Sequence, residues 1–275
     1  MEWFQAVVLG VLQGLTEFLP ISSSAHLRIY PALFGWEDPG APFSAVVQIG
    51  TEAGVILYFI KDIARIINAW VRSLFDAQWR GDEDARMGWW VILGTLPIGV
   101  LGFTFRDIIE NELRSLWLIG TTLLVFGLVL GLADRYGRTD KGIEHLTVGR
   151  VAALGFAQAA ALVPGVSRSG ATISMGRILG LSRTASTRFA FLLAIPAVLG
   201  AGLFQWPSAI AEGGRFDLGP VVVGTLVSFV VGYSVVAWLL RYLQRGTYTP
   251  FVVYRVLLGL VTLILLAMGV LQPYA

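Results

Sequence analysis

Six apolar runs, each about as long as a bilayer is thick, constrain what this chain can fold into. They lie at 41–60, 87–105, 115–133, 185–206, 218–240 and 250–271. A helix needs about 20 apolar residues to cross the hydrocarbon core. Only 14% of the 275 residues are charged, against about 25% in a soluble domain. The alternating segments of a β-barrel are absent. The sequence therefore predicts an all-α, polytopic integral membrane protein with about six transmembrane helices.

Two further apolar stretches end differently. Residues 3–19 run into "LPISSSAH", and residues 148–163 run into "VPGVSRSG". Each turn is followed by an apolar piece too short to span, near 26–35 and 171–181. This pattern predicts two re-entrant helical hairpins, which lipid tolerates only where protein covers them or water reaches them. The alternative is that 3–19 is a span followed by a loop.

The distribution of basic residues gives an orientation. With the N-terminus outside, 14 Lys and Arg residues fall on the inside and four on the outside, as the positive-inside rule requires. The two hairpins would then enter from opposite sides. Weak matches between the halves, such as "VILGTLP" (91–97) with "VVVGTLV" (221–227), support an inverted repeat within one membrane domain. Its halves would cover approximately 1–135 and 148–275.

Composition and motifs exclude several functions. The chain has no cysteine, so disulfides and thiolate chemistry are excluded. The net charge is only +2 and there is no basic stripe with interleaved aromatics, so no nucleic-acid partner is expected. Walker loops, Rossmann fingerprints and His-Glu-x-x-His motifs are absent. The N-terminus lacks a positive region and a cleavage site, and we interpret it as mature protein.

The first turn carries charge and hydroxyls where lipid penalises both. Gln13 and Glu17 are four residues apart and share one helix face. A carboxylate in hydrocarbon costs at least about 2.5–3.5 kcal/mol, so Glu17 needs a cation, donors or water. Ser22, Ser23 and Ser24 open the next helix, where serine caps free N–H groups. His26 follows as a candidate acid, base or nucleophile, or as a residue that only caps the turn.

The second turn, "PGVSRSGAT" (164–172), consists of donors. Glycines let the backbone approach a ligand, an arginine provides a fork suited to phosphate oxygens, and the following helix starts at the same place. The natural ligand is an anion. The candidate substrate-binding residues here are Gly165, Ser167, Arg168, Ser169, Gly170 and Thr172. Arg255, inside the last span, either reaches this site or extends to the membrane surface.

Both motifs, "QGLTEFLPISSSAH" and "PGVSRSGATI", closely resemble the signatures of the undecaprenyl-diphosphate phosphatases of the bacitracin-resistance type. "FSAVVQIG", "RFAFLLAIP" and "PFVVYR" follow in that family's order, so the resemblance covers essentially the whole chain. It implies a bacterial cytoplasmic membrane enzyme that converts undecaprenyl diphosphate to undecaprenyl phosphate for peptidoglycan synthesis. From the orientation given by the basic residues, we expect the two hairpin tips to form one active-site pocket in the outer half of the membrane that opens outward.

The resemblance also implies roles for individual residues. It places catalysis on Glu17, Ser23, His26 and Arg168. It assigns substrate binding to the second motif, with Gln13, Ser22 and Arg255 added as candidates. The family is described as needing Mg²⁺ or Ca²⁺, with Glu17 as the metal ligand here. Many members have a second glutamate where this chain has Gln13, so we expect the diphosphate to hold most of the cation.

The residues leave three points open. The attacking group is His26, Ser23 or a water activated by Glu17. A transporter or flippase of an anionic isoprenyl lipid is the rival function, because inverted repeats with broken helices are typical of transporters. The phosphatidic-acid phosphatase class is excluded, because it needs a second histidine and none follows Arg168. The oligomeric state, a homo-oligomer included, is not determined.

Overall fold

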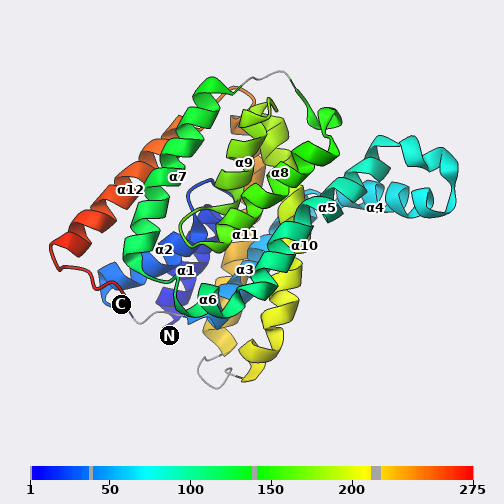
Figure 1. Cartoon of the computed structure of the whole chain (residues 1–275). Coiled ribbons are helices and arrows are strands. Elements are labelled where there is room, and N and C mark those ends of the chain that lie inside the picture. The colour runs from blue at the N-terminus through cyan, green and yellow to red at the C-terminus, as the bar shows by residue number, and fades with distance from the viewer. Residues whose placement is uncertain (1, 37–39, 138–140, 212–217, 275) are drawn as a thin grey trace.

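The computed structural model describes residues 2–36, 40–137, 141–211 and 218–274, and this part of the chain is helical throughout (Figure 1). The α-helices are α1 (Trp3–Thr16), α2 (Ser23–Phe34), α3 (Gly40–Tyr58), α4 (Ile60–Phe75), α5 (Glu83–Thr104), α6 (Arg106–Asn111), α7 (Leu116–Tyr136), α8 (Val148–Ala159), α9 (Arg168–Ile178), α10 (Arg183–Ala211), α11 (Leu218–Tyr242) and α12 (Thr249–Ala267). Short 3₁₀ turns are η1 (Ala77–Gly81), η2 (Ile143–His145) and η3 (Ala160–Leu162).

Five helices in the described part are long and apolar enough to cross a membrane. They are α5, α7, α11, α12 and the part of α10 from Arg183 to Ala201. The sixth predicted span, 41–60, is helix α3, of which Val46–Tyr58 counts among the shorter apolar helices. The prediction of an all-α polytopic membrane protein is confirmed.

The two predicted breaks fall where the prolines and serines stand. Helix α1 has 14 residues and α8 has 12, which gives lengths of about 21 and 18 Å, short of a bilayer's roughly 30 Å. Helix α2 begins at Ser23 and α9 at Arg168, directly after the turns. Because α1 packs against α2 and α8 against α9, each pair is a helical hairpin.

The hairpins pack onto the spans through glycines. Helix α1 lies along α11, where Gly10 meets the backbone of Gly224, and α8 lies along α5, where Gly155 meets the backbone of Gly94. Small residues allow such close approach between membrane helices. Gly94 and Gly224 are also the matching glycines of "VILGTLP" and "VVVGTLV". Each hairpin thus packs against a span from the other half of the chain, through a matching pair of glycines. Two related halves would give this arrangement, and the division into inverted repeats stays a prediction.

We expect Gly155→Ala to destabilise the fold, because the added methyl would overlap the carbonyl oxygen of Gly94 and press on Pro97. Overpacking of this kind costs about 1–3 kcal/mol. The control is Gly149→Ala on the same helix, where a methyl group meets nothing within 4 Å. Thermal unfolding in detergent should separate the two variants. Equal unfolding temperatures would contradict the close α5–α8 contact.

Candidate active site

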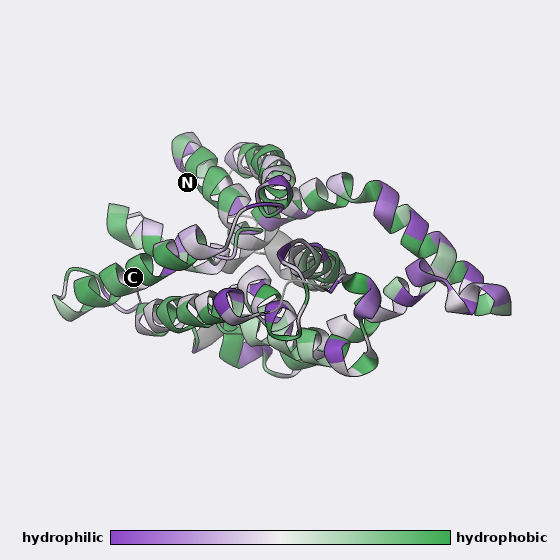
Figure 2. Ribbon diagram, turned by 90° about the horizontal axis from the view of Figure 1, so that it is seen from above, coloured by the Kyte–Doolittle hydropathy of each residue, from purple (hydrophilic) through white to green (hydrophobic). Residues whose placement is uncertain are grey.

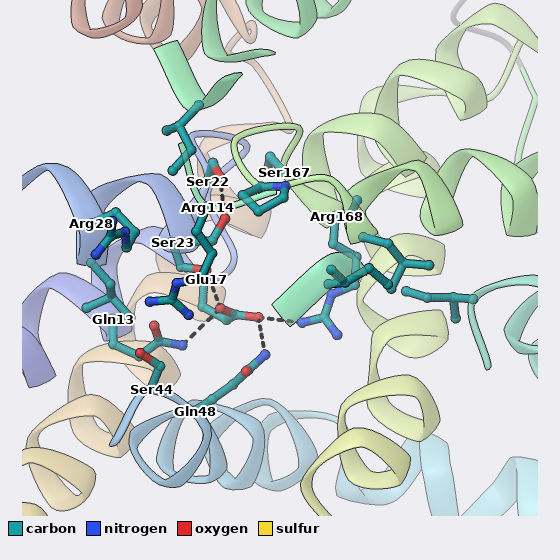
Figure 3. A pocket seen from close by; sticks show the side chains of 18 residues that line it. Gln13, Glu17, Ser22, Ser23, Arg28, Ser44, Gln48, Arg114, Ser167 and Arg168 are labelled. Carbon is teal, nitrogen blue, oxygen red and sulfur yellow. Dashed lines mark hydrogen bonds and ion pairs between the residues drawn. The ribbon is translucent and has the colours of Figure 1, made fainter. Parts of the chain in front are cut away.

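A cavity of about 360 Å³ lies where the two hairpin turns meet (Figure 3). Hairpin one contributes side chains from α1 and α2, and hairpin two contributes the residues around the start of α9. Helices α3, α5, α6 and α7, with the segment between α6 and α7, complete the wall. The lining residues are Gln13, Glu17, Ser22, Ser23, Ser24, Leu27, Arg28, Ser44, Gln48, Ile98, Ile109, Arg114, Ile119, Ala161, Leu162, Pro164, Ser167 and Arg168.

The carboxylate of Glu17 is the centre of this cavity. Its Oε2 accepts hydrogen bonds from Gln13 Nε2 at 2.9 Å and from Ser23 Oγ at 2.6 Å. Its Oε1 accepts from Gln48 Nε2 at 3.1 Å and forms an ion pair with Arg168 (Figure 3). Glu17 is buried, so these four donors offset the loss of water around the charge. The predicted need of Glu17 for a cation and a donor network is met by both hairpins together.

Both turns use the same backbone device. Ser22 and Ser167, the residues before α2 and α9, have φ angles of +74° and +71°. Few side chains tolerate this left-handed region. Ser167 Oγ accepts a hydrogen bond from the Gly170 amide at 3.1 Å and so caps α9. Gly165, at φ +89°, lies against Thr122 and the Ile119 backbone, where a Cβ would collide.

Hydrogen bonds tie the two turns to each other. Ser169 Oγ donates to the Leu19 carbonyl at 3.1 Å, and the Gly165 amide donates to Ser24 Oγ at 3.4 Å. Each bond joins residues more than 140 positions apart in the chain. The predicted residues of the second motif are therefore held against the first turn, as the sequence analysis expected.

Arg255 lies behind the turns and does not line the cavity. It is fully buried, and its guanidinium donates to the carbonyls of Pro20 at 3.1 Å and of Gly165 and Val166 at 2.9 Å each. A weaker bond of 3.4 Å reaches Leu123 in α7. We therefore interpret Arg255 as a clamp between the two turns, whereas the sequence analysis counted it as a substrate ligand.

His26 also lies outside the cavity lining. Its Nδ1 is 2.7 Å from the Ser22 carbonyl, which can only accept, so Nδ1 carries the proton. Its Nε2 is 2.6 Å from the hydroxyl of Tyr254, and the two rings stack with centroids 5.5 Å apart. Both ring nitrogens are thus occupied by the turn and by α12. This arrangement favours the capping interpretation of His26; its catalytic role stays a prediction.

Four predicted ligands of the second motif, Gly165, Ser169, Gly170 and Thr172, are also absent from the lining. The Gly170 amide is the donor that Ser167 Oγ caps at the start of α9, and a Cβ on Gly170 would meet the Arg255 guanidinium. Thr172 is fully buried one turn after Arg168. Gly170 and Thr172 support the start of α9 from behind.

Several cavity residues were not among the predicted site residues. Gln48 lies on α3, and Ser44 lies one turn before it on the same helix. Arg28 lies one turn after Ser24 on α2, a spacing that indicates a shared face and could have identified it. Arg114 lies between α6 and α7, and no motif marks it.

The cavity side chains are poorly suited to hold a divalent cation without the substrate. Glu17 is the acidic side chain among the lining residues, and its two oxygens already accept four hydrogen bonds or ion pairs. Within the described ranges, no three Asp, Glu, His or Cys side chains cluster as metal ligands. Mg²⁺ and Ca²⁺ need several oxygen ligands.

We expect Arg255→Lys to loosen the contact between the turns, because a single ammonium cannot reach carbonyls from both hairpins and α7. The lost bonds to a charged donor are worth about 1.5–3 kcal/mol each. The unfolding temperature should fall, and Arg241→Lys at the exposed end of α11 should leave it unchanged. An unchanged unfolding temperature for Arg255→Lys would contradict the clamp.

Comparison with known proteins gives one answer over the whole length. The family model described as "Bacitracin resistance protein BacA" matches residues 6–261. An undecaprenyl-diphosphatase of Nocardioides sp. is 60% identical and aligns over 98% of both chains. Undecaprenyl-diphosphatase 2 of Frankia casuarinae is 54% identical over all of this chain and 98% of its own. The undecaprenyl-diphosphatase of Streptomyces griseus, also 54% identical, has the same coverage. This chain belongs to the bacitracin resistance protein BacA family.

Proposed function

We propose that this protein removes the terminal phosphate of undecaprenyl diphosphate, giving undecaprenyl phosphate and inorganic phosphate. The observation that carries the proposal is the pairing of Arg168 from one hairpin with Glu17 from the other inside a single polar cavity. The names of relatives at 54–60% identity support the same reaction. The reaction would recycle the lipid carrier of peptidoglycan synthesis, and the bacitracin-resistance description of the family agrees with that.

The charges of the lining suit a diphosphate. Three arginines and one glutamate line the cavity: Arg28, Arg114, Arg168 and Glu17. In Figure 3, Arg168 approaches Glu17 from one side, and Arg28 lies on the other side near Gln13. We assign the terminal phosphate to Arg168, Ser167 and the first amides of α9, a helix N-terminus that favours anions. Arg28 and Arg114 then face the phosphate that stays on the lipid.

The geometry favours Ser23 as the attacking group over His26. Ser23 lines the cavity and already donates its hydroxyl proton toward Glu17 at 2.6 Å. In the proposed step, Ser23 Oγ bonds to the terminal phosphorus, its proton passes to Glu17, and the bond to the bridging oxygen breaks. Undecaprenyl phosphate leaves. Water then cleaves the phosphoserine, releasing phosphate. Arg168 stabilises charge on the equatorial oxygens, the main task in phosphoryl transfer.

We propose that any Mg²⁺ or Ca²⁺ enters with the diphosphate and meets the protein through Glu17. The cation would neutralise charge on the phosphates. The described residues hold no cluster of side chains that could coordinate the cation without the diphosphate. The family supports a location in the bacterial cytoplasmic membrane, and the charge bias of the loops supports a cavity that opens outward.

The experiment that tests the function is phosphate release from undecaprenyl diphosphate by purified protein in detergent, with Mg²⁺ or Ca²⁺ present. Detergent micelles have no second side, so a transporter or flippase would release no phosphate.

We expect Arg28→Gln and Arg114→Gln each to raise KM about 10- to 100-fold, since a hydrogen bond to a charged group is worth about 1.5–3 kcal/mol. Arg241→Gln, outside the cavity, should match wild type. Full activity of both cavity variants would remove them from the binding site.

A second experiment identifies the attacking group. We expect Ser23→Ala to lose at least about 10³-fold in kcat, as enzymes do when a nucleophile is removed. Acid quenching of wild type during turnover should trap phosphate on the peptide that contains Ser23, detected by mass spectrometry. Phosphate on His26 would contradict serine attack, and full activity of Ser23→Ala would exclude it.

A further inference from the structure

Helix α4 and the start of α5 form an arm that leaves the helix bundle sideways. Both views show it projecting away from the other helices (Figures 1 and 2). Only Phe59 separates α4 from α3, and η1 joins α4 to α5. Since α3 is an apolar helix and ends one residue before α4 begins, the start of α4 lies at the end of a membrane helix.

Helix α4 has three distinct faces. The first is buried against α5 through Ile66, Ala69 and Ser73. The second is an exposed apolar stripe with alternating spacings of four and three residues, the repeat of one helix face. This stripe consists of Ile60, Ala64, Ile67, Val71 and Leu74, with Phe75 beside its end. The third face, at the same spacing, carries Lys61, Arg65, Asn68 and Arg72, all exposed.

The apolar stripe is large and unusual for a surface in contact with water. Ile67 is 54% exposed and Phe75 is 85% exposed. Within the described chain, α4 packs against α5, η1 and the end of α3, and these contacts leave the stripe residues exposed, so the stripe needs another apolar environment. A contiguous exposed apolar patch of this kind marks a membrane or protein contact.

The neighbouring polar face decides between those environments. This face is basic. The long apolar side chains of Arg65 and Arg72 let their guanidinium groups reach the headgroup region while the helix itself lies in lipid. Arg65 pairs with Asp62 at 3.3 Å and Asp84 at 2.5 Å, and Arg72 lies 4.8 Å from the ring centre of Trp79. Trp70 and Trp89 meet edge to face where α4 crosses α5, and tryptophan is typical of the headgroup region.

We propose that α4 is an interfacial helix that lies in the surface of the leaflet next to it. Its apolar stripe is embedded among acyl chains, and Lys61 and Arg72 face the phosphates of the lipid headgroups, beside the ion-paired Arg65. The arm is long, amphipathic and laterally placed, as interfacial helices are. It would fix the depth and tilt of the bundle in the bilayer, a role separate from the phosphatase reaction.

The absence of native cysteine makes a direct test simple, because any introduced thiol is unique. Single variants Ile67→Cys and Val71→Cys would carry a nitroxide spin label on the full chain in nanodiscs of phosphatidylcholine and phosphatidylglycerol. Collision with oxygen, which concentrates in lipid, is compared with collision with a water-soluble nickel chelate. We expect both labels to collide with oxygen and to be protected from nickel.

Two controls lie on the same helix. Asn68→Cys, on the polar face, should be open to nickel, and Ala69→Cys, against α5, should be shielded from both agents. Labels at Ile67 and Val71 that nickel reaches freely would place the stripe in water and overturn the proposal. Labels shielded from both agents would indicate a protein partner, such as a second copy of this chain, and would overturn it equally.

Discussion

The ion pair between Glu17 and Arg168 is the interaction on which the site depends. It joins two turns that are 151 residues apart in the chain. Neither residue is tolerable alone inside a membrane domain, because an unpaired buried charge costs several kcal/mol. Once paired, they define a cavity where an anion can compete with Glu17 for Arg168. The same contact therefore stabilises the fold and prepares the binding of a diphosphate.

The surrounding contacts keep that pair in register. Arg255 donates hydrogen bonds to backbone carbonyls of both turns. Ser169 and Ser24 each form a further hydrogen bond from one turn to the backbone of the other. A donor displaced by about 1 Å can cost a phosphoryl-transfer enzyme much of its rate. Residues that never touch substrate are thus needed for the reaction through the positions of those that do.

The two hairpins are built alike and used differently. When Ser22 is matched with Ser167, both at positive φ, Ser23 falls opposite Arg168. The same offset matches Gly10 with Gly155, the two glycines that pack against α11 and α5. One hairpin therefore supplies a carboxylate and a hydroxyl, and the other supplies a cation at the equivalent position. Two similar turns thus give one asymmetric site.

Much of the architecture was predictable because hydropathy is a local property. The spans appear close to their predicted limits, for example 115–133 against Leu116–Tyr136. The breaks at the two proline and serine turns also appear as predicted. The short helices begin at Ser23 and Arg168, so the predicted opening of the next helix by the serines is confirmed. The apolar pieces near 26–35 and 171–181 are the parts of these helices that hydropathy marks, and the polar first turns lie ahead of them.

The sequence by itself determined that the chain is a helical membrane protein, where its helices break, and which two motifs contribute polar residues to the cavity. Only the tertiary structure decided which polar side chains face the cavity. Ser23 faces it, and His26, three residues later on the same helix, faces Tyr254 instead. Arg255 turned out to bind backbone, whereas Arg28 and Arg114 line the cavity. The physical reason is that the direction of a helix face depends on partners more than a hundred residues away, and no local pattern records them.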